Sequence, residues 1–444
     1  MNISVIGLGK LGLCTAACFA AAGHQVYGYD VSEHTRNELK ARRPPIDETG
    51  LSELLQTAWG ALHIVDSCDD AVLASDATLI IVPTPSLPDG RFTNDYLIRV
   101  LESMTPALQA KNTFHIVDIV STVMPGSCDT VFRPLLEQLT GKACGIDFGL
   151  VYNPEFIALG SVIRNFLNPD MVLIGTSDDR SGSVIRELYH STCTTSPTIA
   201  VMSLINAEIT KISLNCYVTM KISYANGLAA ICEKVEGADI DVITAAIGAD
   251  SRVGSKCLKG GLGFGGPCFP RDNIAFQAFA EEFGGEALLG KAVVAVNNSI
   301  PGRIFDRIAA CCAAPARVSL LGLSYKPDTH IIEESHSVML ARLLSNAGYT
   351  VSLHDPKSLA AAKAQLGDEM HYAASIDECL TDTSAIVLMT DWPEYRELDW
   401  TRIASLARPG TAVIDCWRTA GDSITPAFTY IPLGIGISTR MNAL

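Results

Sequence analysis

The chain has 444 residues, of which 48% are hydrophobic and 18% charged, and its formal net charge is −15. A length of this order predicts about three domains of roughly 150 residues each. The acidic balance argues against nucleic acid as a partner, because polyanions are bound by basic surfaces. We find no run of roughly 18 or more uncharged apolar residues, so we expect no membrane span and no membrane partner.

The N-terminus and the cysteines bear on the compartment. The chain opens directly on a strand-like run, without the basic region or cleavage site of a secretory signal, so we expect a cytoplasmic protein. Its 14 cysteines are scattered without a CxxC pair and are typical of thiols rather than of a disulfide framework. The 9 histidines lie far apart, and no metal-ligand spacing is present, so we expect no metal site.

The N-terminal segment predicts a dinucleotide-binding turn. A β-branched run over residues 2–7 meets the sequence GLGKLG, a helical pattern follows, and a second strand over Gln25–Tyr29 ends at Asp30. Gly7 and Gly9 allow a tight turn and the close approach of a pyrophosphate to the helix N-terminus, and Gly12 lets the helix pack on the strand. Asp30 can accept from a ribose 2′-hydroxyl. No arginine directly follows Asp30, which favours NAD over NADP. The expected cofactor residues here are Gly7, Gly9, Lys10, Leu11, Gly12 and Asp30.

Further βα units follow, and polar residues stand just after three of their strands. The predicted strands are Leu79–Val82, Phe114–Val120, Leu150–Tyr152 and Met171–Ile174. Thr84, Thr122 and Glu155 follow the first three. Each alone is equally typical of a turn cap, but ligands bind beyond the carboxyl ends of parallel strands. Together the three favour a functional edge of the sheet, with Thr84 and Thr122 near the cofactor.

From Ser203 the pattern changes to a helical period that reaches about Val235. Glu208, Lys211 and Asn215 share one face at i, i+3 and i+7, and periodicity alone favours a solvated face for them. A long helix between two α/β halves also suits a dimer spine. Shorter helices are predicted at Ile240–Ile247 and Asn273–Phe283.

A glycine-rich stretch from Arg252 to Asp272 separates these two shorter helices. Its six glycines exclude a helix interior, where each costs about 1 kcal/mol relative to alanine. They fit a backbone that approaches a ligand closely or turns with positive φ. Cys268, presented by this stretch, is a candidate nucleophile.

A second α/β unit begins near Ala316, without a GxGxxG sequence. A helical linker is expected around Val293–Ala310. The expected strands are Arg317–Leu321, Thr350–His354, Ala385–Met389 and Thr411–Ile414. We therefore predict an α/β chain divided into domains over residues 1–198, 199–300 and 301–444.

In these motifs the chain resembles the UDP-glucose/GDP-mannose 6-dehydrogenases over nearly its whole length. The resemblance rests on GLGKLG, VPTP, STVMPG, NPEF, AEITKISLN, GGLGFGGPCFPRD and GLSYKPDT. It implies an N-terminal Rossmann NAD-binding domain, a central long-helix dimerisation region and a C-terminal Rossmann-like UDP-sugar-binding domain. The family oxidises the C6 hydroxymethyl group of a nucleotide sugar to a carboxylate with NAD⁺. The resemblance also implies a homodimer.

The resemblance also implies catalytic roles. Cys268 is the nucleophile that captures the aldehyde as a thiohemiacetal, which is then oxidised to a thioester. Lys211 stabilises the developing oxyanion or donates a proton, and Asn215 is its amide companion.

The remaining catalytic roles concern water. Glu155 is the candidate general base for thioester hydrolysis. Asp272 acts through a water near the cysteine, and Thr122 is the threonine that holds this water.

Substrate contacts are implied with the same resemblance. Arg252 matches an arginine that reaches the partner subunit's substrate. Lys259 and Lys326 match substrate- or cofactor-contacting lysines, although ordinary surface lysines are the alternative. The implied substrate residues are Glu155, Phe156, Lys211, Asn215, Arg252, Lys259, Gly260, Gly261, Phe264, Gly265 and Lys326.

Several positions depart from the family pattern. Leu159 stands in the place of a second glutamate, and Glu333 in that of an arginine, preceded by His330-Ile331 where an acidic pair is usual. Arg418 is moved by one position, and Val120 replaces a basic residue before STV. These departures indicate a divergent subgroup whose sugar need not be glucose.

The leading interpretation is an oxidoreductase that converts UDP-glucose to UDP-glucuronate for polysaccharide biosynthesis. UDP-N-acetylhexosamine, UDP-hexosamine and GDP-mannose are alternative substrates. A catalytically silent nucleotide-sugar and NAD binding protein is a rival from another class. A two-electron β-hydroxyacid-type dehydrogenase is a third interpretation, but such chains lack a second α/β domain and a loop cysteine.

Overall fold

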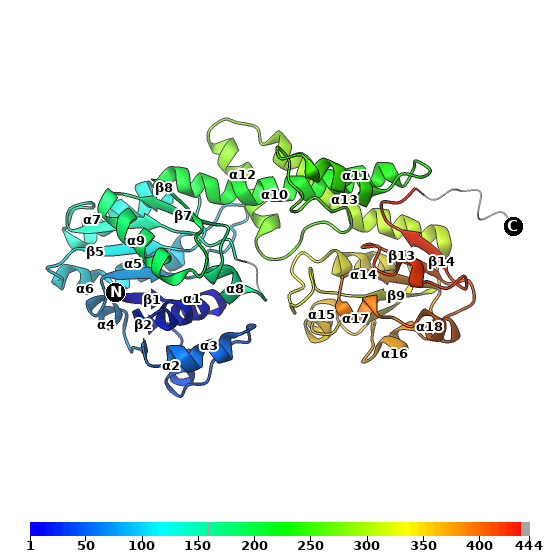
Figure 1. Cartoon of the computed structure of the whole chain (residues 1–444), viewed down its shortest axis with the longest axis horizontal. Helices are drawn as coiled ribbons and strands as arrows, with labels where there is room; N and C mark the ends of the chain where they lie inside the picture. Colours follow the sequence, from blue (N-terminus) through cyan, green and yellow to red (C-terminus); the bar gives the residue numbers. More distant parts are fainter. Residues whose placement is uncertain (158–159, 437–444) are drawn as a thin grey trace. The chain divides into compact units, whose positions relative to one another are not determined.

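The computed structural model describes residues 1–157 and 160–436. The chain divides into two units, Met1–Ser213 and the residues from Leu214 onward. Figure 1 labels the helices and strands of both units.

The first unit is built on an eight-stranded sheet of order β3-β2-β1-β4-β5-β6-β7-β8. All neighbouring strands are parallel except β6 and β7, which are antiparallel. The order reverses between β1 and β4, and this is where open α/β sheets bind ligands. The strands are β1 Asn2–Ile6, β2 Gln25–Tyr29, β3 Leu62–Ile64, β4 Ala77–Ile80, β5 His115–Ile119, β6 Phe148–Tyr152, β7 Met171–Thr176 and β8 Thr198–Ser203.

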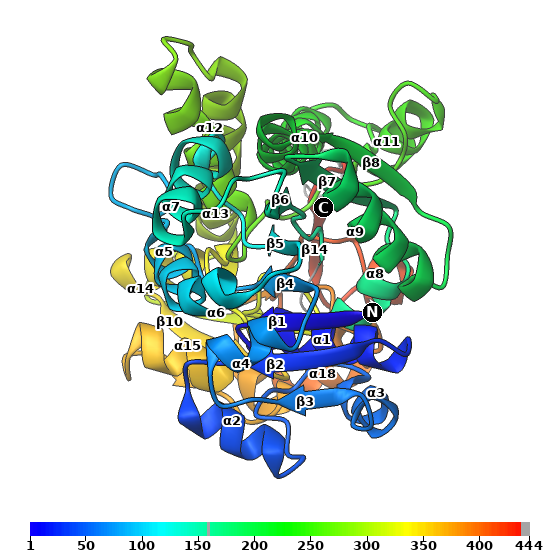
Figure 2. The ribbon, with the colours of Figure 1, turned by 90° about the vertical axis from the view of Figure 1, so that its left-hand side faces the viewer.

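Helices cover both faces of this sheet (Figure 2). Helices α1, α3, α8 and α9 bury one apolar cluster against it, and α4 to α7 bury another. Helix α2 follows β2, and a short π-helix at Cys128–Phe132 precedes α7. The helices are α1 Lys10–Ala21, α2 Glu33–Lys40, α3 Leu51–Ala58, α4 Cys68–Leu73, α5 Asp95–Ser103, α6 Thr105–Ala110, α7 Arg133–Thr140, α8 Val162–Leu167 and α9 Asp179–Thr192.

A long helix, α10, runs over Leu204–Cys232 and includes the boundary between the two units. It is followed by α11 Ile240–Ala249, α12 Phe269–Glu282 and α13 Leu288–Cys311. The glycine-rich stretch lies between α11 and α12 and forms no helix or strand up to Cys268.

The second unit contains a six-stranded parallel sheet of order β11-β10-β9-β12-β13-β14. Helices α13, α14 and α15 contribute to an apolar cluster with this sheet, and α16 to α18 contribute to another. The elements are β9 Arg317–Leu321, α14 His336–Asn346, β10 Thr350–His354, α15 Leu359–Leu366, β11 His371–Tyr372, α16 Ile376–Leu380, β12 Ala385–Leu388, α17 Pro393–Arg396, α18 Trp400–Leu406, β13 Ala412–Asp415 and β14 Thr429–Pro432.

The sequence predictions succeed and fail for local reasons. The predicted bounds of β2, β9 and β10 are confirmed. The prediction of Leu79–Val82 is wrong by two residues, because the amide of Val82 donates to the Ser121 hydroxyl at 2.9 Å after the strand has ended. Helix α12 begins four residues before the predicted Asn273, since Pro270 is tolerated in the first turn of a helix.

No helix in the described part of the chain is long and apolar enough to cross a membrane.

Gly12 tests how tightly the first turn is packed. A Cβ atom at Gly12 would lie 1.8 Å from the carbonyl oxygen of Gly7, and Gly12 is buried in α1. Overpacking of this kind costs about 1–3 kcal/mol, so we expect Gly12→Ala to lower the unfolding temperature of the apo protein by about 5 °C. Calorimetry measures this unfolding temperature. The matched control is Gly9→Ala, because nothing lies within 4 Å of a Cβ there; equal losses in both variants would contradict the packing argument.

Candidate active site

The glycine turn after β1 is tied to the end of β2. The carboxylate of Asp30 accepts the backbone N–H of Leu8 at 2.7 Å and that of Ser32 at 2.8 Å. Gly7 has a φ of +94°, and a Cβ there would lie 2.2 Å from the carbonyl oxygen of Ile81. The two Asp30 hydrogen bonds and the close approach of Gly7 to Ile81 fix the turn and the acidic residue at the carboxyl edge of the sheet.

This turn fits a dinucleotide pyrophosphate. Gly9 is the N-cap of α1, no side chain caps the helix, and no acidic residue stands in its first turn. The N-terminus of a helix presents N–H groups and partial positive charge to an anion. The space at Gly9 is open, whereas at Gly7 and Gly12 a Cβ would collide with the backbone. Gly9, Lys10 and Leu11 would hold the pyrophosphate of NAD, with Asp30 at its ribose.

Sequence reasoning overlooked Arg36 beside this turn. Its guanidinium donates to the carbonyl oxygen of Asp30 at 2.6 Å and lies 5.4 Å from the ring centroid of Tyr29. The sequence argument considered only the position directly after Asp30. A basic residue in the helix that follows β2 was the signal that could have revealed Arg36.

The loops after β4 and β5 are joined by hydroxyl hydrogen bonds. The Thr84 hydroxyl donates to the carbonyl oxygen of Thr122 at 2.7 Å. The Ser121 hydroxyl donates to the carbonyl oxygen of Val82 at 2.6 Å. Thr84 and Thr122 therefore lie together at the edge where the sequence predicted them.

Glu208 of α10 anchors the same loop region. It is 0% exposed, and its carboxylate accepts the backbone N–H groups of Gly126 at 2.6 Å and Cys128 at 2.8 Å. Burial raises the pKa of Glu208, and the two amide hydrogen bonds oppose this rise. The sequence placed Glu208 on a polar helix face but did not predict that it fixes the loop after Thr122.

Burial and two neighbouring groups set the charge of Glu155. Burial raises the pKa of Glu155 to about 7, and the Tyr189 hydroxyl and Lys211 act in the opposite direction. Tyr189 donates to Glu155 Oε1 at 2.9 Å, and the Lys211 ammonium donates to the backbone carbonyl of Glu155. Lys211 Nζ also lies 4.4 Å from the ring centroid of Phe156. A carboxyl with such a pKa suits proton transfer near neutral pH.

The polar face of α10 is not solvated. Lys211 and Asn215 are only 6% and 8% exposed, and Glu208 is fully buried. The solvated face that periodicity alone favoured is therefore wrong, because helical spacing does not reveal which face packs against other elements.

In the second unit, Cys268 and Asp272 lie one turn apart. Cys268 is the exposed N-cap residue of α12, and its carbonyl oxygen accepts the Asp272 N–H at 2.9 Å. Asn215 Nδ2 donates to Asp272 Oδ2 at 2.6 Å, and Asp272 is 2% exposed. Arg271 Nε lies 3.6 Å from the other carboxylate oxygen of Asp272. The partial positive charge of a helix N-terminus favours a thiolate at Cys268.

The glycines from Gly260 to Gly266 are required by close protein neighbours, whereas nothing lies within 4 Å of a Cβ at Gly254. A Cβ at Gly261 would lie 2.9 Å from the Trp417 ring, and one at Gly266 would lie 2.8 Å from the Tyr325 ring. Gly266 also has a φ of +80°, which side chains rarely adopt. Cβ atoms at the other positions would also meet protein atoms within 3.0 Å, namely at Gly260, Gly263 and Gly265.

Two buried asparagines hold this segment by its backbone. Asn226 of α10 accepts the Gly261 N–H at 2.8 Å and donates to the Leu262 carbonyl at 3.2 Å. Asn297 of α13 accepts the Phe264 N–H at 2.8 Å and donates to its carbonyl at 3.1 Å. Buried backbone groups need such partners outside regular secondary structure.

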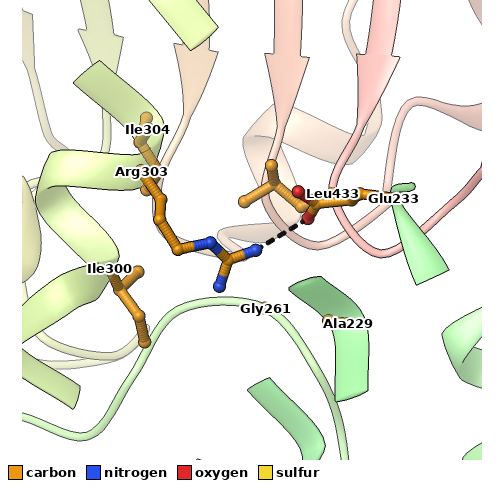
Figure 3. A pocket seen from close by; sticks show the side chains of 7 residues that line it. All are labelled: Ala229, Glu233, Gly261, Ile300, Arg303, Ile304 and Leu433. Atoms are coloured by element: carbon orange, nitrogen blue, oxygen red, sulfur yellow. Dashed lines mark hydrogen bonds and ion pairs between the residues drawn. The ribbon is translucent and has the colours of Figure 1, made fainter. Parts of the chain in front are cut away.

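An ion-pair cluster lies beside Gly261 (Figure 3). Arg303 and Arg307 of α13 bind the two oxygens of Glu233 at 3.1 and 2.9 Å. Glu233, Arg303 and Gly261 line a cavity of only about 10 Å³, which is about the size needed for one water. It is a packing gap rather than a ligand site.

The implied substrate lysines lie over aromatic rings of the second unit. Lys259 is exposed, with Nζ 5.8 Å from the Trp417 ring, and Lys326 Nζ lies 5.8 Å from the Tyr325 ring. Arg252 is exposed and pairs with Asp250 at 2.6 Å.

The departures from the family pattern have structural consequences. Glu333 lines a hollow of about 300 Å³ that also includes Arg271, so a positive charge lies in the same hollow. Arg418 donates to the carbonyl of Gly260 at 2.7 Å and forms an ion pair with Asp241, so the shifted arginine holds the glycine segment. Val120 is buried in the core. Leu159 lies outside the described residues.

The structure thus assembles two groups of predicted residues, each within its own unit. The first unit brings Thr84 to Thr122, and Lys211 to Glu155 and Phe156. The second brings Asn215 and Cys268 to Asp272. The described cysteines form no disulfide.

Three sequence profiles of one family match successive parts of the chain. The NAD binding domain of the UDP-glucose/GDP-mannose dehydrogenase family matches residues 1–193. Its central domain matches residues 205–299, and its UDP binding domain matches residues 319–421.

Characterised relatives extend over most of the chain. UDP-glucose 6-dehydrogenase AglM of Haloferax volcanii is 35% identical over 402 residues, which cover 90% of this chain and 93% of that protein. A UDP-glucose dehydrogenase structure from Pyrobaculum islandicum is 34% identical, with a TM-score of 0.87 and 98% of each chain covered. A UDP-D-ManNAc dehydrogenase structure from Pyrococcus horikoshii is 25% identical, with a TM-score of 0.83 and coverage of 99% and 100%. The chain belongs to the UDP-glucose/GDP-mannose dehydrogenase family, as its motifs predicted, and is an NAD-dependent dehydrogenase.

Proposed function

We propose that this enzyme oxidises the C6 hydroxymethyl group of UDP-glucose to the carboxylate of UDP-glucuronate. The observation that carries the proposal is the exposed Cys268 at the N-terminus of α12, with buried Asp272 one turn on and bonded to Asn215. A nucleotide-sugar binder would need no such nucleophile. The names of the H. volcanii and P. islandicum relatives favour glucose as the sugar.

The reaction passes through a covalent adduct on Cys268. NAD, held at Gly9, Lys10 and Leu11 with its ribose at Asp30, would supply the hydride acceptor for both oxidations. Loss of a proton and a hydride from the C6 alcohol gives an aldehyde, and the Cys268 sulfur adds to its carbon to form a thiohemiacetal. Loss of a second hydride and proton gives a thioester. Water then adds to the thioester carbon, and the thiol leaves as the carboxylate forms.

The other side chains act on protons and developing charge. Lys211 stabilises the oxyanion at C6, with Asn215 as an amide donor. Glu155 takes a proton from the hydrolytic water, which its pKa of about 7 suits, since a base must be ionised at the working pH. Asp272 and Thr122 orient a water near the cysteine.

The sugar diphosphate would bind along the glycine segment and its lysines. The backbone of Gly260–Gly265 is held in place by Asn226 and Asn297, which accept the N–H groups of Gly261 and Phe264, so the segment has a fixed position beside Lys259. Lys259, Lys326 and the aromatic rings beside them would supply charge and apolar contact. Phe156 and Phe264 are further residues of this proposed substrate site.

We also propose a division of labour along the chain. Residues 1–198 bind NAD, 199–300 carry the catalytic loop and dimer contact, and 301–444 bind the nucleotide sugar. We propose the cytoplasm as the compartment, which keeps the 14 thiols reduced.

We propose a homodimer, and an exposed apolar stripe on α10 supports it. Tyr217, Tyr224 and Ile231 are spaced seven residues apart and are 52%, 57% and 60% exposed. Val242 on α11 is 66% exposed. Exposed apolar patches mark interfaces, and a period of seven is typical of helix–helix packing. Arg252 would reach the partner subunit's substrate.

Substrate and stoichiometry are tested together. We expect the purified enzyme to form two NADH per UDP-glucose, followed by absorbance, with UDP-glucuronate identified by mass spectrometry. UDP-N-acetylmannosamine, UDP-glucosamine and GDP-mannose should react at least about tenfold more slowly in kcat/KM, a difference of about 1.4 kcal/mol. If one of these nucleotide sugars is oxidised faster than UDP-glucose, it is the substrate in place of UDP-glucose. One NADH per sugar would refute the four-electron reaction, and binding without turnover would favour a silent binder.

Cys268→Ser tests covalent catalysis. We expect steady-state turnover to fall about 10³-fold or more, because a hydroxyl replaces the thiolate, while the unfolding temperature stays unchanged since residue 268 is exposed. The matched control is Cys257→Ser, an exposed cysteine earlier in the same segment. It should retain wild-type turnover. Near wild-type turnover by Cys268→Ser would remove the thioester mechanism.

Mixed dimers test whether Arg252 serves the partner. Arg252→Ala and Cys268→Ser homodimers should each be nearly inactive. A heterodimer of the two, isolated with different affinity tags, should recover about half the wild-type activity, because one intact site combines Cys268 of one protomer with Arg252 of the other. An inactive heterodimer would show that Arg252 serves its own protomer. Light scattering of the wild type checks the dimer itself.

A further inference from the structure

Tyr189 of α9 makes a buried hydrogen bond that the proposed reaction does not yet use. Its hydroxyl donates to Glu155 Oε1 at 2.9 Å, and the residue is 2% exposed. The ring meets Phe19 edge-on at 6.0 Å between centroids and is tilted against Phe166 at 5.8 Å. These neighbours fix the ring, so the hydroxyl is held at the carboxylate.

The loop that carries Glu155 needs such a contact. The Lys211 ammonium binds the backbone carbonyl of Glu155 and so fixes the main chain. Glu155 follows the end of β6 at Tyr152 and so lies outside the sheet. Tyr189 is therefore the residue that fixes the carboxylate oxygen itself.

The charged and titratable groups around Glu155 come from four other elements. Lys211 on α10 and Tyr189 on α9 both favour the ionised carboxylate. Burial raises the pKa of Asp118 on β5 well above its usual range, and Asp118 is 0% exposed. Burial also raises the pKa of Cys18 on α1, and that of Cys193 after α9 to about 11. In all three of these groups burial disfavours a negative charge beside Glu155.

We propose that Tyr189 is a positioning residue for Glu155, whose hydroxyl holds the carboxylate in the orientation and the ionised form that water activation requires. The proposal rests on the role of Glu155 as the base in thioester hydrolysis. A carboxylate that loses a donor in a buried site binds its proton more tightly. Without the hydroxyl, Glu155 would stay protonated to higher pH and lose its fixed direction.

Tyr189→Phe removes only the hydroxyl and keeps the aromatic cluster. We expect the acidic limb of the kcat–pH profile to move up by about one pH unit, as the loss of a hydrogen bond to a charged group predicts. At pH values below this limb, the turnover of Tyr189→Phe should be about tenfold lower than that of the wild type at the same pH. Well above the limb, the two turnovers should be nearly equal. KM for the nucleotide sugar should stay unchanged, because Tyr189 acts through Glu155.

A second readout isolates the hydrolysis step. Below the limb, Tyr189→Phe should accumulate the Cys268 thioester during turnover, which intact-protein mass spectrometry of acid-quenched enzyme detects. The matched control is Tyr395→Phe, which loses a buried hydroxyl hydrogen bond to the His354 carbonyl at 3.0 Å in the other unit. It should leave both the limb and the thioester level unchanged.

Glu155→Gln separates the failure of this inference from that of the proposed function. If Glu155→Gln hydrolyses the thioester at the wild-type rate, Glu155 is not the base. The proposed role of Glu155 and the positioning role of Tyr189 are then both refuted. If Glu155→Gln is impaired but Tyr189→Phe keeps the wild-type limb, only the role of Tyr189 is overturned. A uniform loss at all pH values with a lowered unfolding temperature would show a merely structural tyrosine. Adding Tyr189→Phe to Glu155→Gln should change the hydrolysis rate no further.

Discussion

The structure around Cys268 depends on how two asparagine side chains hold a backbone that has no secondary structure of its own. Asn226 and Asn297 each pair with one N–H and one carbonyl of the glycine-rich segment. Each amide thereby replaces a neighbouring strand. Because the segment lies so close to these helices and to Trp417 and Tyr325, its glycine positions have no room for a side chain, namely Gly260, Gly261, Gly263, Gly265 and Gly266. The glycines follow from this packing, and Cys268 is delivered to the start of α12 as a result.

The sequence predicted those features that are encoded locally. Alternation and turn residues located β2, β9 and β10. It could not predict Asn226 or Glu208, whose partners lie 35 and 80 or more residues away along the chain. A polar residue in a helical pattern has the same signature whether it meets water or a buried amide. Position in the fold decides between these outcomes.

The glycine fingerprint shows the same limit at a finer scale. The sequence assigned Gly12 to the packing of helix on strand, and it assigned Gly7 and Gly9 together to the turn and the pyrophosphate. In the structure, protein backbone lies against Gly7 and Gly12 and excludes side chains there, whereas the space at Gly9 is open. The motif therefore records two constraints, the fold of the turn and the approach of a ligand, and the sequence alone does not separate Gly7 from Gly9.

Three carboxyl groups of the first unit, of which two are buried and Glu155 is half-buried, show how surroundings assign roles to the same chemistry. Glu208 accepts two backbone N–H groups, which favour a fixed ionised anchor for the loop after Thr122. Asp118 has no hydrogen-bond partner for either oxygen within the described residues, and burial favours its neutral form. Glu155 lies between these extremes, because one hydroxyl and one ammonium partly offset its burial and leave its pKa at about 7. Only this intermediate balance permits a carboxyl to exchange a proton near neutral pH, so the argument for Glu155 as the base rests on its neighbours as much as on its motif.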